Sequence, residues 1–160
     1  MRRWLGVLTV LGAMPAGASA QGVLERLEGT WLGTGELLGR PAAFELTWAP
    51  ALGGRFVRLE LENFFVSDTG RTPVLEAVGY YPAAGSGTGT WVDSRGVVFT
   101  LDVRTSGDTL RVGWKGLRES GESEYVQTSD SVLVVTDRVR QGGELRVFAT
   151  STLKRRATSP

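Results

Sequence analysis

Hydrophobic and polar residues alternate along most of this chain, and the alternation predicts β-strands. Between 55 and 65, Val57, Leu59 and Leu61 fall on one side of an extended strand, and charged residues fall on the other. The same period of two recurs between 97 and 104. Such a pattern is typical of a sheet with one packed face and one wetter face.

Ten segments of this kind are separated by residues that favour turns, chiefly glycine, proline, serine and aspartate. The predicted strands are 30–38, 44–48, 55–65, 74–81, 89–93, 97–104, 109–115, 122–128, 131–137 and 144–153. One short stretch before them, 23–28, has helical character. The connections are too short for parallel crossovers, so they favour antiparallel hairpins.

The predicted fold class is therefore all-β, a single antiparallel up-and-down barrel of about ten strands with a short N-terminal helix. A flat meander would leave two unpaired edges, and closure into a barrel removes them. Glycines within or beside the predicted strands, at 29, 33, 35 and 79, permit the sharp coiling that closure requires. A β-sandwich is the alternative.

The first twenty residues have the pattern of a secretory signal peptide. Arg2 and Arg3 form a basic start, 4–14 is an apolar run, and Ala18 and Ala20 form an A-x-A cleavage site. The run is shorter than the roughly 20 residues that span a bilayer, so no membrane span is expected. The predicted organisation is a signal peptide at 1–20 and one barrel domain at 21–160, in a periplasmic or secreted protein.

Composition narrows the chemistry that the chain can perform. Among 160 residues there are 18 Lys and Arg against 17 Asp and Glu, with no histidine and no cysteine. A chain this close to neutrality gives no electrostatic reason to expect nucleic-acid binding. Disulfides, thiol catalysis, Ser-His catalysis and histidine ligation of haem or zinc are excluded. The acidic residues lack the spacing of a calcium loop, so no metal site and no cofactor are expected.

Three stretches together resemble a known group of barrels. Segment 27–35, LEGTWLGTG, is similar to the opening G-x-W-x-G-x-G of the nitrobindin-like and fatty-acid-binding-like barrels of the calycin group. Segments 48–58, WAPALGGRFVR, and 89–96, GTWVDSRG, resemble a related bacterial family whose function is not established. The resemblance implies a short helix, ten antiparallel strands around a cavity, and a tryptophan, here Trp31, that closes the barrel floor.

The resemblance implies the fold and leaves the cofactor unsupported. Nitrobindins bind haem through a histidine on a late strand, and this chain has none. Tyrosine can ligate haem iron, but nothing in the spacing of Tyr80, Tyr81 and Tyr125 favours it. We therefore expect no haem.

Aromatic residues in the predicted strands are the main candidates for ligand binding. They are Trp31, Trp48, Tyr80, Trp91, Trp114 and Tyr125. An eight- to ten-stranded barrel can hold one small ligand, and indole or phenol rings suit an apolar pocket with polar tips. The alternative is that the same rings fill the core and plug the barrel ends.

Two charged residues are further candidates for the ligand site. Arg58 would bind a ligand carboxylate if its face of the strand pointed inward. A solvated stripe of charged residues costs less free energy than a buried one and is the alternative. Glu76 alternates with Val74 and Val78, so it is either a lone inward charge or an exposed one. No catalytic constellation is found.

The predicted function is an exported barrel that binds a small apolar or amphipathic molecule in its interior, without enzymatic activity. One alternative is a solidly packed interaction or structural barrel with an outer apolar patch that uses Tyr80, Val98 or Phe148. Another is an isomerase or lyase, which requires Glu76 or Glu60 to face inward within hydrogen-bond reach of an arginine. The ligand and the oligomeric state are not predicted.

Overall fold

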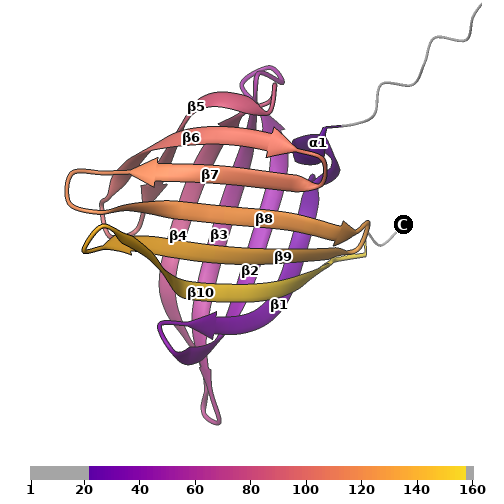
Figure 1. Ribbon diagram of the computed structural model, residues 1–160. Helices are drawn as coiled ribbons and strands as arrows, with labels where there is room; N and C mark the ends of the chain where they lie inside the picture. Colours follow the sequence, from indigo (N-terminus) through magenta and orange to yellow (C-terminus); the bar gives the residue numbers. More distant parts are fainter. Residues whose placement is uncertain (1–21, 158–160) are drawn as a thin grey trace, which may run out of the picture.

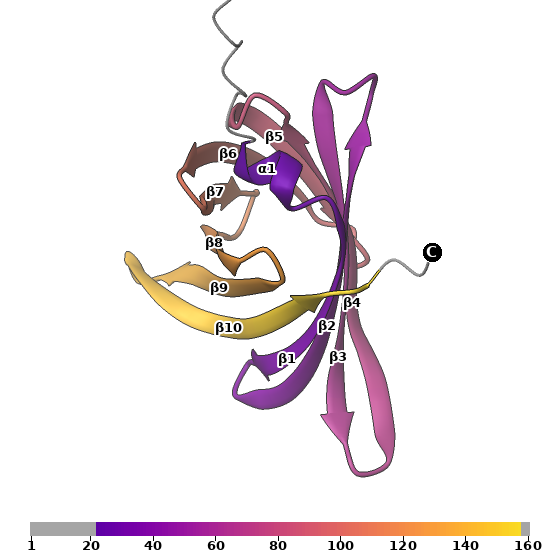
Figure 2. The ribbon, with the colours of Figure 1, turned by 90° about the vertical axis from the view of Figure 1, so that its right-hand side faces the viewer.

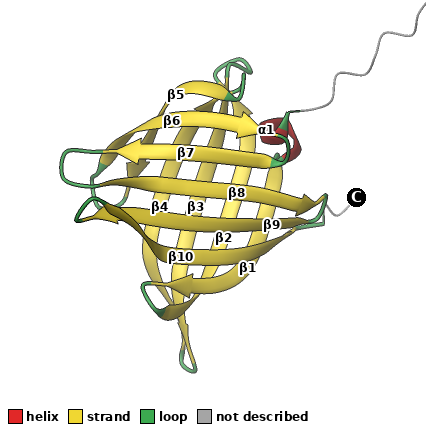
Figure 3. Cartoon of the chain, in the orientation of Figure 1, coloured by secondary structure: helices red, strands yellow, loops and turns green. Residues whose placement is uncertain are grey.

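The structure is a computed structural model that describes residues 22–157. Figures 1 and 3 show a barrel of antiparallel strands with one short helix at its N-terminal side. The elements are α1 (Val23–Arg26), β1 (Gly29–Leu37), β2 (Arg40–Ala51), β3 (Phe56–Ser67), β4 (Gly70–Pro82), β5 (Ser86–Asp93), β6 (Val98–Ser106), β7 (Thr109–Lys115), β8 (Ser120–Ser129), β9 (Val132–Gln141) and β10 (Glu144–Arg155). The expected signal peptide at 1–20 lies outside the described residues.

The sheet is closed, which confirms the predicted fold class and excludes the β-sandwich. Each strand pairs with its neighbours in sequence, and β1 pairs with both β2 and β10. The seam runs from Trp31 opposite Arg155 to Leu37 opposite Ala149. Within 22–157, no helix has the length and apolar character needed to cross a membrane.

Several strands are longer than the alternation predicts. β2 begins at Arg40 instead of 44 and includes Pro41 and Pro50. Both prolines lie near an end of the strand, where a missing backbone donor disturbs the ladder least. β3 continues to Ser67 and β4 begins at Gly70, and the hairpin that they form projects beyond the barrel (Figure 2). β5 begins at 86 because its glycine-rich start still pairs with β6.

The interior is tightly packed at the end of the barrel that α1 covers. Leu24 and Leu27, in and just after α1, are buried, and Trp31 on β1 has none of its surface exposed. The Trp31 Nε1–H donates to the Leu27 carbonyl oxygen at 2.8 Å, and the Arg155 guanidinium stacks 4.2 Å from the Trp31 ring centroid. Arg155 also donates to the carbonyl oxygens of Glu28 and Arg26, so it ties β10 to the helix segment.

Glycine is required where β1 coils against β10. A Cβ atom at Gly33 would lie 2.1 Å from the Thr152 carbonyl oxygen, and one at Gly35 would lie 1.9 Å from the Thr150 carbonyl oxygen. Backbone atoms form both contacts, so no side-chain rotation relieves them. The seam therefore depends on two residues that lack a side chain.

We expect the substitution Gly35→Ala to destabilise the barrel by about 3 kcal/mol, because the β1 and β10 backbones must move apart. Gly22→Ala is the matched control, since a Cβ at Gly22 meets nothing within 4 Å. Urea unfolding followed by tryptophan fluorescence measures both variants. Equal midpoints for the two would contradict this account of the seam.

Candidate functional site

A cavity of about 420 Å³ occupies the half of the barrel that lies away from α1. Its rim is formed by the hairpins opposite α1, where Leu38, Arg95 and Glu119 lie. Apolar side chains line most of it, among them Leu37, Phe44, Leu61, Phe99, Trp114 and Phe148. The barrel is thus filled at one end and hollow at the other.

A chain of hydrogen-bonded polar groups crosses the deep part of the cavity. Asp137 on β9 lies opposite Ser123 on β8 in the strand register, and the Ser123 hydroxyl donates to its carboxylate. Ser123 also contacts Tyr125, and the Tyr125 hydroxyl is hydrogen-bonded to that of Tyr81 on β4. Trp48 packs on this tyrosine pair, its ring centroid 5.1 Å from Tyr81 and 5.4 Å from Tyr125.

Burial sets the protonation of this chain. It raises the pKa of Asp137 to about 6, and the Ser123 hydrogen bond and the Arg138 charge offset it only in part. Burial likewise raises the pKa of Tyr81 and of Tyr125, so both hydroxyls keep their protons at neutral pH. Asp137 is therefore the one member that titrates near neutrality.

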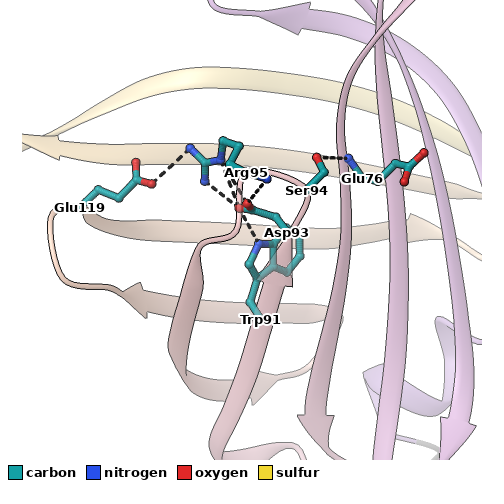
Figure 4. A network of polar contacts seen from close by, with 6 residues as sticks. All are labelled: Glu76, Trp91, Asp93, Ser94, Arg95 and Glu119. Carbon is teal, nitrogen blue, oxygen red and sulfur yellow. Dashed lines mark hydrogen bonds and ion pairs between the residues drawn. The ribbon is translucent and has the colours of Figure 1, made fainter.

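A second polar network lies at the rim (Figure 4). The Asp93 side chain is fully buried and accepts hydrogen bonds from Arg95 Nη2 at 2.7 Å, the Arg95 backbone N–H at 2.9 Å and Trp91 Nε1 at 3.4 Å. The other arm of the guanidinium reaches Glu119, with 3.2 Å between Nη1 and Oε1. Arg95 therefore links the β5–β6 hairpin to the β7–β8 hairpin across the rim.

Opposing effects act on the Asp93 carboxyl group. Burial alone would raise its pKa, but the hydrogen bonds and positive charge of Arg95, with the Trp91 N–H, lower the pKa below its usual value. The carboxylate is thus held in its charged form by Arg95.

Two buried polar atoms have no hydrogen-bond partner within the described residues. One is Asn63 Oδ1, on a side chain that lines the cavity and belongs to a residue only 6% exposed. The other is Trp48 Nε1, beside the tyrosine pair. An unpaired buried polar atom costs about 1 to 3 kcal/mol, so Asn63 brings a spare acceptor to the cavity wall.

Three of the residues proposed from the sequence line the cavity: Trp91, Trp114 and Tyr125. Trp114 lies 5.0 Å from Phe99 and extends the aromatic lining. Trp48 contributes indirectly, through the tyrosine pair that it packs against. Trp31 lies under α1 and does not reach the cavity.

The other three proposed residues, Arg58, Glu76 and Tyr80, lie on the outer face of the barrel and do not line the cavity. Arg58 forms an exposed ion pair with Glu60, at 3.0 Å. Because β3 directs its apolar residues inward, its charged stripe faces outward. On β4 the inward positions include Ala77 and Tyr81, so Glu76, Val78 and Tyr80, which alternate with them, face outward.

Sequence reasoning missed most of the polar lining. Asp137 carries a usable signal, because it continues the inward alternation of Leu133 and Val135. Asp93 stands beside a turn, which favours a capping role from the sequence alone, although it alternates with Trp91 on the same face. No local signal joins Arg95 to Glu119, because the contact is made between two hairpins. Within 22–157, no three acidic side chains are grouped closely enough to hold a metal ion.

Replacing Asp137 by asparagine removes the group that titrates near neutrality. The pKa of Asp137 in the folded chain, about 6, exceeds its ordinary value of 3.8, so the folded state binds more protons between these pH values and loses stability as the pH rises through them. Asp137→Asn should therefore be more stable than the wild type at pH 7.5 by about 2 kcal/mol, with the difference shrinking toward pH 4. Urea unfolding across this pH range measures it.

Asp102→Asn, at an exposed position on the outer face, is the matched control and should show no such pH-dependent gain. A stability difference between Asp137→Asn and the wild type that stays constant with pH would refute the assignment.

Replacing Arg95 by glutamine leaves the buried Asp93 carboxylate without its cation. We expect a loss of about 2 kcal/mol at pH 7, less than for a wholly buried pair because Arg95 is about half exposed. The lowered pKa of Asp93 stabilises the wild type above the ordinary aspartate pKa. This stabilisation is lost as the pH falls from there through the lowered pKa of the folded state, so the deficit should narrow in acid.

Thermal unfolding at several pH values tests this, with Arg104→Gln as control. Arg104 pairs with Asp102 where both side chains are mostly exposed, so its loss should have little effect. Equal losses for the two arginine variants would contradict the role given to Arg95.

Comparison with known proteins supports the fold and no finer assignment. No protein-family model matches the chain, and a search of curated proteins found no match. The crystal structure of Rv2717c from M. tuberculosis is similar over 84% of this chain and 95% of that chain, with a TM-score of 0.62 and 18% identity. An S-type phycobiliprotein lyase, CPES from Guillardia theta, is similar over 86% and 92%, with a TM-score of 0.55 and 12% identity. Both have calycin-like folds, and at these identities the similarity shows the fold alone.

Proposed function

We propose that this chain is an exported barrel protein that binds one small apolar or amphipathic molecule in the cavity and catalyses no reaction. The observation that carries the proposal is the cavity itself, about 420 Å³ with a mostly apolar lining and a few inward polar groups. Those are the ordinary properties of a small-molecule site. A barrel that served only as a packed scaffold would gain stability by filling this space.

Export to the periplasm or beyond the cell belongs to the same proposal. Its support is the basic start, apolar run and A-x-A site of 1–20. The resemblance of three segments to nitrobindin-like and fatty-acid-binding-like barrels supports interior binding as well, because those barrels enclose a cavity. The absence of histidine argues against haem as the ligand.

A lyase or isomerase activity is the second candidate, and one observation favours it. A solved structure with a similar fold is named as a phycobiliprotein lyase. Glu60 and Glu76 face outward, and Arg95 holds Asp93 and Glu119, so acid–base chemistry in the cavity would fall to Asp137 with Ser123. The cavity-lining arginine, Arg95, is already held by two carboxylates, which favours binding over catalysis.

A substitution that fills the cavity tests the binding proposal. The neutral dye N-phenyl-1-naphthylamine should bind the wild type with enhanced fluorescence, and Leu61→Trp should reduce its affinity at least tenfold because the larger ring fills the space. Leu117→Trp is the matched control: Leu117 is fully exposed on the surface, and the variant should bind like the wild type.

Circular dichroism and thermal unfolding confirm that each variant is folded. Organic extraction of the purified protein followed by mass spectrometry seeks a molecule carried from the cell. An empty extract together with no dye binding would overturn the proposal, and so would equal dye affinity in Leu61→Trp and Leu117→Trp.

A further inference from the structure

We propose that the cavity prefers amphipathic amines, with a protonated amino group held at Asp137 and an apolar body lying along the aromatic lining. The inference rests on the proposed function, that the cavity binds a small molecule, and it adds the chemical class of that molecule. Three observations carry it: the balance of charge in the cavity, the lack of a cation at Asp137, and a spare acceptor on the opposite wall.

The cavity has an excess of negative charge. Its lining includes three carboxylates, Asp93, Glu119 and Asp137, against one guanidinium, Arg95. Arg95 is bound to both Asp93 and Glu119, so it has little capacity left for a ligand anion. A carboxylate ligand would enter a site of like charge, whereas a cation would find complementary charge.

Asp137 has no salt bridge within the described residues. The neighbouring Arg138 lowers the Asp137 pKa through its charge, but its guanidinium contacts the carboxylates of Glu122, at 3.4 Å, and Glu124, at 3.8 Å, instead. Inside the cavity the carboxylate has only the Ser123 hydroxyl as a hydrogen-bond donor. An ionised carboxylate accepts more than one hydrogen bond, so Asp137 has acceptor capacity for an ammonium group.

Asn63 supplies the independent observation. Its side chain comes from β3, several strands away from β9 around the barrel, and its Oδ1 atom is buried without a partner. The hydroxyls of Ser123 and Tyr125 are already engaged with Asp137 and Tyr81, and the Asp137 carboxylate and Asn63 Oδ1 both offer acceptor capacity to a ligand. A ligand rich in donors, such as an ammonium group with three N–H bonds, fits these acceptors.

The aromatic lining is compatible with the same ligand. Trp114 packs 5.0 Å from Phe99 and 6.4 Å from Phe148, and these rings form one wall of the cavity. Such rings bury an alkyl or aryl body and attract a nearby cation through their electron-rich faces.

Three ligands of equal chain length and different charge test the inference. Isothermal titration calorimetry of the full mature chain at pH 7.5, below the micelle concentrations, compares decylamine, decanol and decanoate. We expect decylamine to bind at least tenfold more tightly than decanoate. Asp137→Asn should weaken decylamine at least tenfold and leave decanol within twofold, and Asp102→Asn should change neither.

A spectroscopic readout separates a direct contact from a structural effect. In the wild type, a carboxyl ¹³C titration should show that decylamine lowers the pKa of Asp137 from about 6 and that decanol does not. The groups that face Asp137 are Ser123 and Tyr125 on β8, Tyr81 beyond them on β4 and uncharged Ala149 on β10. The charged groups Asp93, Arg95 and Glu119 lie at the rim, so the carboxyl signals of Asp93 and Glu119 provide an internal comparison in the same spectra.

The outcomes distinguish this inference from the proposed function. Tight binding of decanol with no preference for decylamine, or a preference for decanoate, overturns the inference and leaves the cavity as a binding site. An unchanged Asp137 pKa in the presence of bound decylamine also overturns it. If none of the three ligands binds and the neutral dye does not bind, the proposed function fails and the inference fails with it.

Discussion

Backbone pairing between β1 and β10 is the constraint on which the rest of the structure depends. A ten-stranded meander has walls on every side only if its first and last strands meet, and here they meet along Trp31–Leu37 of β1. The coil required at that seam brings the Thr150 and Thr152 carbonyl oxygens to within about 2 Å of where a Cβ would lie on Gly35 and Gly33. Without the seam both edge strands would be unpaired, and the cavity would open along its length.

The enclosed space has a packed end and a hollow end. Near α1, large residues such as Trp31, Leu133 and Leu153, on the neighbouring strands β1, β9 and β10, have no exposed surface. Toward the opposite rim, small residues such as Ala149 occupy inward positions, and Trp114 covers Gly121 so closely that a Cβ there would lie 2.2 Å from its ring. The cavity is thus enclosed mainly by large apolar and aromatic side chains, within a wall that closure makes continuous.

The fold was predictable from the sequence because its signal is local, whereas most of the site was not. Alternation and turn residues each act over a few positions, and ten such segments with short connections favour an antiparallel barrel. The direction of a face is harder to infer when both faces carry apolar residues: Val78 and Tyr80 alternate as regularly as Ala77 and Tyr81, and only the pairing with β3 and β5 determines which pair faces inward. Asp137 follows from the inward alternation of β9, whereas the Arg95–Glu119 contact depends on how two hairpins pack.

The position of Asp137 is the strongest argument that the hollow end has a role beyond structure. A half-buried carboxylate with a raised pKa and no ion-pair partner among the described residues lowers stability at neutral pH, and a neutral side chain of similar shape would not. In the packed end, by contrast, the buried polar residue Gln127 is neutral and hydrogen-bonded to Arg26. Side chains that lower stability are typical of functional sites. The function requires them, whereas optimal packing would favour apolar residues at the same positions. The same carboxylate that weakens the empty barrel is the group that a cationic ligand would neutralise, so ligand binding and stability are coupled through one residue.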